Sequence, residues 1–220
     1  MKALKERGSE IWQVPYLPID PSDIGREYEP IVRINSQSGK GGVAFIMDTY
    51  FGFKLPKGMH KEFANVIQKI SEQQGEVSPE QIMDKFREEY LAKKEPIHFR
   101  RLRMDDLSGD SEIKSQFDTR VAVVYTHSGV EKTFEAVGNG PIDATKRGLQ
   151  EELDIDIKIL DYEEHALQSG SNSQAAAYIH LLDVESGRVT YGVGVSSNIT
   201  RASVRAIFSA VNRLELGQHK

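Results

Sequence analysis

Residues 133–144 read TFEAVGNGPIDA, a strand pattern that passes through two glycines into a helix opening with proline. Pro141 suits the first helical position, because its φ is fixed and its missing N–H would have no intrahelical partner there. Gly138 and Gly140 allow the backbone to bend sharply and to approach a ligand closely. The amides of the first helical turn and the helix dipole then favour a bound carboxylate or phosphate. Taken alone, the segment fits a strand-to-helix connection without a ligand equally well.

A second unit of the same kind follows near the end of the chain. Residues 188–195 have a strand pattern, residues 196–200 form a turn with N-cap candidates, and residues 201–214 predict an amphipathic helix. This helix is expected to bury one face, which is formed by Ala202, Val204, Ile207, Phe208, Val211 and Leu214.

Alternating segments precede both helices. In residues 117–125 and again in residues 175–181, the residues that favour strands recur at every second position. This period is typical of a sheet with one covered face. We therefore predict an α+β fold with a duplicated strand-strand-strand-helix module, one copy at about 97–155 and the other at about 156–216.

The part of the chain before these modules has a different character. Residues 1–30 are punctuated by prolines and predict an extended segment, whereas residues 31–95 predict a small helical subdomain that serves as a linker. Residues 96–220 then form the duplicated domain. One helix is predicted at 57–74, where an apolar stripe at helical spacing is formed by Met59, Phe63, Val66, Ile67 and Ile70.

A second linker helix begins at a capping box. Residues 78–81 read Ser-Pro-Glu-Gln, which places a cap, a proline and a reciprocal glutamine in the right order. The helix is expected to run to about Ala92, with Ile82, Phe86 and Tyr90 facing inward. Residues 93–96, Lys-Lys-Glu-Pro, end it and make a plausible connection to the next domain.

Residues 36–42, SQSGKGG, invite comparison with a nucleotide-binding loop. Such a loop needs a glycine five residues before its lysine and a serine or threonine directly after it. Asn35 and Gly41 occupy those positions around Lys40. We therefore interpret the stretch as a glycine-permitted turn and helix start that leads into residues 43–47.

Composition limits the classes of function. With 220 residues, 39% of them hydrophobic, the chain can build one medium domain or two small ones. Its net charge of −5 offers no basic field for nucleic acid. No apolar run reaches the roughly 20 residues that span a bilayer, and no signal-peptide core begins the chain, so we expect no membrane partner and a cytoplasmic location. The absence of cysteine excludes disulfides and cysteine-ligated zinc.

Several ordered motifs resemble the α-isopropylmalate synthase family. The region after that family's catalytic barrel is similar to residues 12–21 (WQVPYLPIDP) and 33–44 (RINSQSGKGGVA). Its C-terminal leucine-sensing domain is similar to residues 138–141 (GNGP), 160–166 (LDYEEHA), 174–178 (QAAAY) and 210–213 (AVNR). The resemblance runs in order from about Ile11 to Leu214.

The resemblance implies a regulatory region without its catalytic part. In this family, acetyl-CoA condenses with 2-oxoisovalerate in an N-terminal barrel of the triosephosphate isomerase type, which holds a divalent metal, and that barrel is absent here. The six histidines of this chain form no ligand pair at helical or strand spacing. We therefore expect no catalytic residue, metal site or cofactor in these residues, and a chain that is catalytically silent by itself.

The resemblance also implies roles for individual residues. Tyr16 matches a linker tyrosine near a neighbouring subunit's active site, so we expect it to couple the subunits. The alternative is a purely structural role, in which Tyr16 anchors an extended arm by hydrophobic contact. The positions matching the leucine site are Gly138, Asn139, Ile142, Asp143, Ile159, Tyr162, Ala166, Ser173 and Ala175, with Val195 as a weaker candidate. Asp143 and Ser173 stand where alanine is frequent in the family, so the selectivity or affinity for leucine is expected to differ here.

The chemistry of these residues suits an α-amino acid. The amides near residues 140–143 can take a carboxylate, Asp143 or backbone carbonyls can accept from the ammonium, and Ile142, Ile159 and Ala166 can line a small apolar pocket. The expected partners are L-leucine, a second copy in a homodimer, and the catalytic barrel as a domain or polypeptide. Three alternatives stay open: a free-standing amino-acid-binding module, a separate regulatory subunit, and a citramalate synthase domain that senses isoleucine.

Overall fold

The computed structural model describes residues 40–91, 93–107, 118–167 and 173–215. Contacts divide the chain into two compact units, Met1–Val32 and Arg33–Lys220, and every described residue belongs to the second. The predicted extended segment and Tyr16 therefore lie outside the described residues. The predicted division near residue 95 falls in the connection before the first strand, inside this second unit.

The linker part is helical, as predicted, with helices α2 (Lys40–Phe51), α3 (Lys57–Gln74) and α4 (Pro79–Phe86). The capping box at the start of α4 is confirmed, since Gln81 N–H donates to Ser78 Oγ at 3.3 Å and Ser78 N–H donates to Gln81 Oε1 at 2.9 Å. Among the described helices, none combines the length and apolar content that crossing a bilayer would require.

The helix that was predicted to run to Ala92 changes its winding after Phe86. A π-helical turn, η2 (Arg87–Leu91), follows α4. Tyr90 is fully buried on this turn, with its ring centre 5.2 Å from that of Phe86 and 5.7 Å from that of Phe63. Periodicity gives no warning of this change, because the inward positions Ile82, Phe86 and Tyr90 are spaced as in an α-helix.

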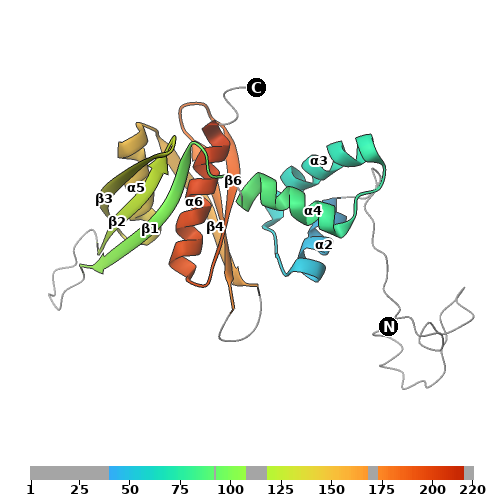
Figure 1. The fold of residues 1–220 in the computed structure, drawn as a ribbon, viewed down its shortest axis with the longest axis horizontal. Coiled ribbons are helices and arrows are strands. Elements are labelled where there is room, and N and C mark those ends of the chain that lie inside the picture. Colours follow the sequence, from blue (N-terminus) through green and yellow to red (C-terminus); the bar gives the residue numbers. More distant parts are fainter. Residues whose placement is uncertain (1–39, 92, 108–117, 168–172, 216–220) are drawn as a thin grey trace, which may run out of the picture. The chain divides into compact units, whose positions relative to one another are not determined.

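Two three-stranded antiparallel sheets form the rest of the structure (Figure 1). The first module comprises β1 (Ile97–Asp106), β2 (Thr119–His127), β3 (Val130–Gly138) and α5 (Pro141–Leu153), and the second comprises β4 (Ile157–Ala166), β5 (Ala175–Asp183), β6 (Val189–Ser196) and α6 (Ile199–Glu215). The order within each sheet follows the sequence. The predicted α+β architecture with two modules is confirmed.

An irregularity in the strand pairing recurs in both modules. The register between β1 and β2 shifts between Phe99 and Arg101, and the register between β4 and β5 shifts between Ile159 and Asp161. Each shift follows the third residue of the module's first strand. A repeated bulge at equivalent places supports the duplication independently of the residue pattern.

Helix α6 is buried on more sides than its pattern predicts. It packs against β5 and β6 of its own module and also against β1 of the other (Figure 1). The ring of Phe208 lies 5.7 Å from that of Phe99 and 5.9 Å from that of Tyr125. The six predicted core residues are all buried, but so are Ser203, Ala206, Ser209, Ala210 and Asn212. The reason is that both modules contribute to one shared core.

The two modules achieve close helix-to-sheet packing in opposite ways. In the first module, a Cβ on Gly148 of α5 would overlap the ring of Phe134 on β3. In the second, a Cβ on Gly192 of β6 would overlap the backbone of Ala206 on α6. The strand residue is thus large where the helix has glycine, and the strand has glycine where the helix carries a methyl group.

Candidate functional site

The turn between β3 and α5 places helix amides beside open space. Gly140 is the N-cap of α5, and the first hydrogen bond of the helix runs from Ala144 N–H to Gly140 O at 2.9 Å. The N–H groups of Ile142 and Asp143 therefore precede the helix's own hydrogen-bond ladder. The helix dipole adds partial positive charge at the same place. This end of α5 is suited to an anion.

The two glycines of the turn have different surroundings. A Cβ on Gly138 would overlap the backbone of Ala144 and approach Asp143, so this glycine permits the close contact of strand and helix. A Cβ on Gly140 would meet no atom within 4 Å, and its φ of 178° is extended backbone that any residue adopts. The chain does bend at Asn139 and Gly140, as expected, and the structure leaves open space beside Gly140.

Asp143 holds its negative charge at the start of α5. Its Oδ2 accepts from Arg147 Nε at 2.8 Å and from Asn139 N–H at 3.2 Å, and Lys146 Nζ lies 3.4 Å from its Oδ1. Partial burial acts to raise the pKa of Asp143, but these hydrogen bonds and cations hold it below its ordinary value. Sequence reasoning missed Lys146 and Arg147, although their i+3 and i+4 spacing from Asp143 was a usable signal.

A second group of candidate residues lies on the sheet of the other module. Ile159, Tyr162 and Ala166 are on β4, and Ala166 pairs directly with Ala175, the first residue of β5. Ser173 is half-buried just before that strand. The half-buried apolar residues that pack on the shared core include Ile142, Ile159, Tyr162 and Ala175. The first of these lies in the first turn of α5, and the others lie in the second module.

Tyr162 is tied to the beginning of α6. Its hydroxyl donates to the carboxylate of Glu164 and lies 2.9 Å from Ser203 Oγ. Burial, together with the hydrogen bond to Glu164, raises the pKa of Tyr162 to about 12. The phenol is therefore protonated at neutral pH; its one hydrogen is donated to Glu164, and its oxygen can still accept a hydrogen bond. Ser203 was not predicted as a site residue, because no sequence motif surrounds it.

Val195 is placed apart from the other candidates. It pairs with Ala176, whereas Ala175 pairs with Ser196. Since neighbouring residues of a strand point to opposite faces, Val195 faces away from the sheet surface that carries Ala175. It lines a cavity with residues of the helical linker that include Phe53 and Met83.

The remaining candidates form two groups within one chain. The turn group lies where β3 meets α5 and comprises Gly138, Asn139, Ile142 and Asp143; the β4 group lies on and beside β4 and comprises Ile159, Tyr162, Ala166, Ser173 and Ala175. Helix α5, which carries the turn group, packs on β2, β3 and α6, while β4, which carries most of the other group, pairs with β5. Both β3 and β4 are edge strands. Exposed apolar side chains lie on these edges, namely Val130 and Val137 on β3 and Leu160 on β4. Such edges are suited to contact with another surface.

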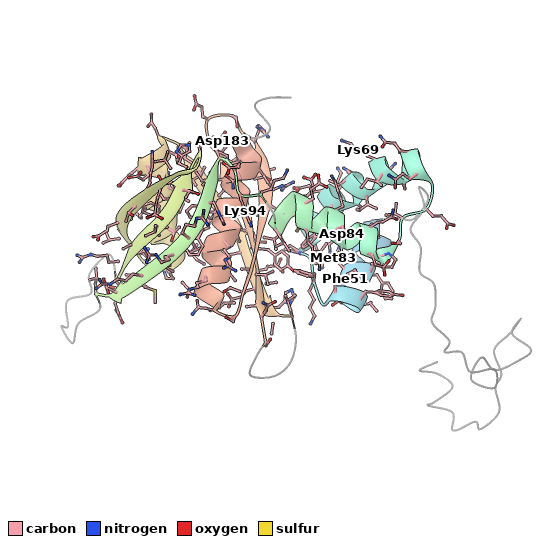
Figure 2. All side chains as sticks on the ribbon, viewed as in Figure 1. Phe51, Lys69, Met83, Asp84, Lys94 and Asp183 are labelled. Atoms are coloured by element: carbon pink, nitrogen blue, oxygen red, sulfur yellow. The ribbon has the colours of Figure 1, made fainter. Side chains whose placement is uncertain are left out.

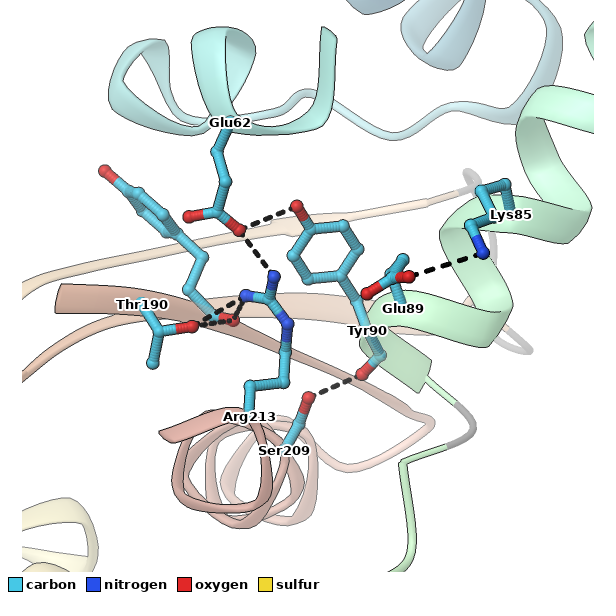
Figure 3. A network of polar contacts seen from close by, with 8 residues as sticks. Glu62, Lys85, Glu89, Tyr90, Thr190, Ser209 and Arg213 are labelled. Atoms are coloured by element: carbon cyan, nitrogen blue, oxygen red, sulfur yellow. Dashed lines mark hydrogen bonds and ion pairs between the residues drawn. The ribbon is translucent and has the colours of Figure 1, made fainter. Parts of the chain in front are cut away.

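A polar network joins the helical linker to the second module (Figure 3). The carboxylate of Glu62 on α3 accepts from Tyr90 Oη at 2.8 Å and pairs with Arg213 of α6, also at 2.8 Å. Arg213 also donates to Thr190 Oγ1 at 2.7 Å, and Ser209 Oγ donates to the backbone oxygen of Tyr90. The network fixes α3, η2, β6 and α6 to one another.

Within the described ranges, no three of the histidine, aspartate and glutamate side chains gather closely enough to hold a metal ion. The polar groups of the candidate site are hydrogen-bond donors, acceptors and paired charges. They can bind and orient a small charged ligand.

Two protein families match the chain. Residues 76–215 match the LeuA allosteric (dimerisation) domain, and residues 1–48 match a family described as alpha-isopropylmalate synthase, post-catalytic domain-like. The first match covers both modules and the end of the linker.

Similar proteins carry the name 2-isopropylmalate synthase. That of Clostridium acetobutylicum is 45% identical over 217 residues, which are 98% of this chain and 38% of that protein. That of Corynebacterium glutamicum is 43% identical over 203 residues, 92% of this chain and 32% of that protein. That of Brucella suis is 39% identical over 215 residues, 97% of this chain and 38% of that protein. The chain thus spans between about a third and two fifths of these relatives.

Proposed function

Since the chain belongs to the LeuA allosteric (dimerisation) domain family, we propose that it is the leucine-sensing region of a 2-isopropylmalate synthase. The observation that carries the proposal is the β3–α5 turn, where helix amides lie beside the open space at Gly140. The activity to be regulated is the condensation of acetyl-CoA with 2-oxoisovalerate. A catalytic barrel, as a domain or as a separate polypeptide, performs it with a divalent metal that this region does not need.

The carboxylate of leucine binds at the N–H groups of Ile142 and Asp143. The helix dipole favours the negative charge, and Lys146 and Arg147 outweigh the single charge of Asp143 on this turn of α5. Each charge-assisted hydrogen bond contributes about 1.5–3 kcal/mol. Asp143 Oδ1, which lies 3.4 Å from Lys146 Nζ, is the acceptor for the ammonium group.

The isobutyl group of leucine is bound by the apolar residues of the second group. Ile159, Ala166 and Ala175 offer a small apolar surface, and Ser173 borders it. Burying a leucine side chain contributes about 1.5–3 kcal/mol. Tyr162 places a protonated hydroxyl at the edge of this surface. Val195 faces the opposite side of its sheet, so its contribution is indirect.

A homodimer brings the two groups together. The turn group and the β4 group belong to different modules, and each lies at an edge strand that carries exposed apolar side chains. Contact between the turn of one copy and β4 of the other completes the ligand site. Leucine then binds one arrangement of subunits better than another, which is the condition for inhibition. Tyr16, which precedes the described residues in the sequence, transmits the difference to the barrel.

The test compares two glycine variants. Gly140→Val places its Cβ in the open space beside the amides, where no atom lies within 4 Å, so we expect the fold to be retained and leucine affinity to fall at least about tenfold. Gly138→Ala forces a methyl group onto the backbone of Ala144 and lowers the melting temperature instead. Calorimetric titration with leucine and thermal unfolding measure the two effects. Unchanged affinity in Gly140→Val would contradict the proposed ligand position.

A further inference from the structure

A cavity of about 310 Å³ lies between the start of β1, the end of β6 and helix α6. It is lined by Leu91, Lys93, Lys94, Ile97, His98, Phe99, Val193, Gly194, Val195, Arg205, Phe208 and Ser209. The glycines and acidic residues of the β3–α5 turn are not among these lining residues. A cavity of this size is in the range that holds a small organic ligand.

The charged residues that line this cavity are all cationic. Lys93, Lys94 and Arg205 contribute three positive charges, and no described lining residue is an aspartate or glutamate. Two carboxylates lie near these residues: Glu88 is close to Lys93, and Glu95 is close to His98. The cavity therefore attracts an anion and repels a cation.

Arg205 is held in position for such an anion. One of its terminal nitrogens donates to the backbone oxygen of Val195 on the edge strand β6. A guanidinium has five N–H donors in a planar fork, so the others can bind a carboxylate. A guanidinium anchored by one hydrogen bond loses less conformational freedom when it binds the ligand.

The inner wall of the cavity is apolar. Ile97, Phe99, Val193 and Phe208 are buried hydrophobic residues that line it. His98 also lines the cavity. Its burial, together with Arg100 and Lys94, holds the pKa of His98 below its ordinary value, so the imidazole is neutral at neutral pH.

We propose that this cavity binds a small organic monoanion that carries a compact hydrocarbon group and no ammonium. The carboxylate pairs with Arg205 and Lys94, and the hydrocarbon group packs on Phe99 and Phe208. An amino acid is rejected, because its ammonium would lie among cations without a carboxylate to accept its hydrogen bonds. The site is independent of the proposed leucine site and shares only Val195 with the residues predicted for it.

The experiment titrates the full chain with 4-methylpentanoate, which is leucine without its ammonium group. Calorimetry is run on the native chain and on three variants: Arg205→Gln, Lys94→Gln, and Lys69→Gln as a control. Figure 2 labels Lys94, which precedes β1, and Lys69, which is an exposed residue of α3 outside the cavity lining. The two lysine variants make the same change of charge.

We expect 4-methylpentanoate to bind, and its affinity to fall at least about tenfold in Arg205→Gln and severalfold in Lys94→Gln, while Lys69→Gln is unaffected. Saturating leucine leaves this binding in place. No heat with up to about 10 mM 4-methylpentanoate would overturn the proposal, as would equal losses in Lys94→Gln and Lys69→Gln. Displacement by leucine would overturn it too, by assigning the anion to the leucine site. Lys94 and Arg205 are both exposed, but only the Arg205 variant removes the hydrogen bond to Val195 described above. If Arg205→Gln does not fold, Lys94→Gln therefore decides the matter.

Discussion

The guanidinium of Arg213 lies 2.8 Å from the carboxylate of Glu62 and 4.2 Å from the centre of the Tyr90 ring. One side chain of α6 thus contacts both α3 and η2 of the helical linker. This contact is therefore a direct connection between the second module and the helical linker.

We predict that Arg213→Met lowers the free energy of unfolding by about 1–3 kcal/mol. The substitution removes the ion pair with Glu62 and the hydrogen bond to Thr190, both of which are only partly exposed to water. Urea unfolding measures the loss. Arg87→Met is the control, since its pair with Asp84 is largely exposed and is worth at most about 0.5 kcal/mol. Equal losses of unfolding free energy in Arg213→Met and Arg87→Met would contradict a stabilising role for the contact between Arg213 and the linker.

Asn212 offers a second test at the same end of α6. Its side chain is fully buried, accepts from Ile97 N–H at 3.0 Å, and donates to Ile97 O at 2.7 Å and to Lys93 O at 3.1 Å. Asn212→Ala leaves these backbone groups without their partner. We expect a loss of about 2–4 kcal/mol in urea unfolding. A loss below about 1 kcal/mol would mean that water replaces the amide easily.

The first module has glycine on its helix and the second has glycine on its strand, and this difference predicts that a second substitution can compensate for the first in only one of them. Gly148→Ala pushes a methyl group into the Phe134 ring and should cost about 1–3 kcal/mol. Adding Phe134→Leu removes the obstructing ring atoms, so part of the loss from Gly148→Ala should be recovered in the double variant. Gly192→Ala has no such remedy, because its added methyl group meets the backbone of α6. A double-mutant cycle by thermal unfolding checks the coupling. Additive losses would argue against direct contact.

Asp143 predicts a specific dependence of stability on pH. Its pKa is lower in the folded chain than in the unfolded chain, so its contribution to stability is present above the ordinary carboxyl range. It is lost as the pH falls through the lower folded value. Unfolding measured between about pH 5 and pH 3 should therefore show a shallower decline of stability for Asp143→Asn than for the native chain. Identical slopes would mean that Arg147 and Lys146 do not stabilise the charge.

Much of the fold could be predicted from the sequence. Helix α3 has the predicted bounds, the capping box at Ser78 forms, and β2 buries alternate residues as expected. These features depend on neighbouring residues, so local patterns reveal them. In β5 the expectation of a single covered face is wrong, because Ala176 and Tyr178 on the opposite face are buried as well. The resemblance to α-isopropylmalate synthase is confirmed over both modules and the start of the chain.

Features that join distant segments could not be predicted. The burial of α6 on most sides requires Phe99 and Tyr125 from the other module, and the pair of Arg213 with Glu62 requires the linker to pack on β6 and α6. No periodicity encodes either contact. The ligand-binding roles of the turn group and the β4 group remain predictions. Val195 lies on the opposite face of its sheet, because a step of one residue along a strand changes the face to which a side chain points.

The most direct test of the account is calorimetric titration of the native chain with leucine, with isoleucine, valine and 2-oxoisovalerate as comparators. We predict micromolar, leucine-selective binding, with one ligand for each chain in a dimer whose mass is checked by sedimentation. Binding of isoleucine in preference to leucine would instead favour a domain of the citramalate synthase type. Absence of heat with leucine, in a chain that is folded and dimeric, would contradict the claim that these modules sense leucine.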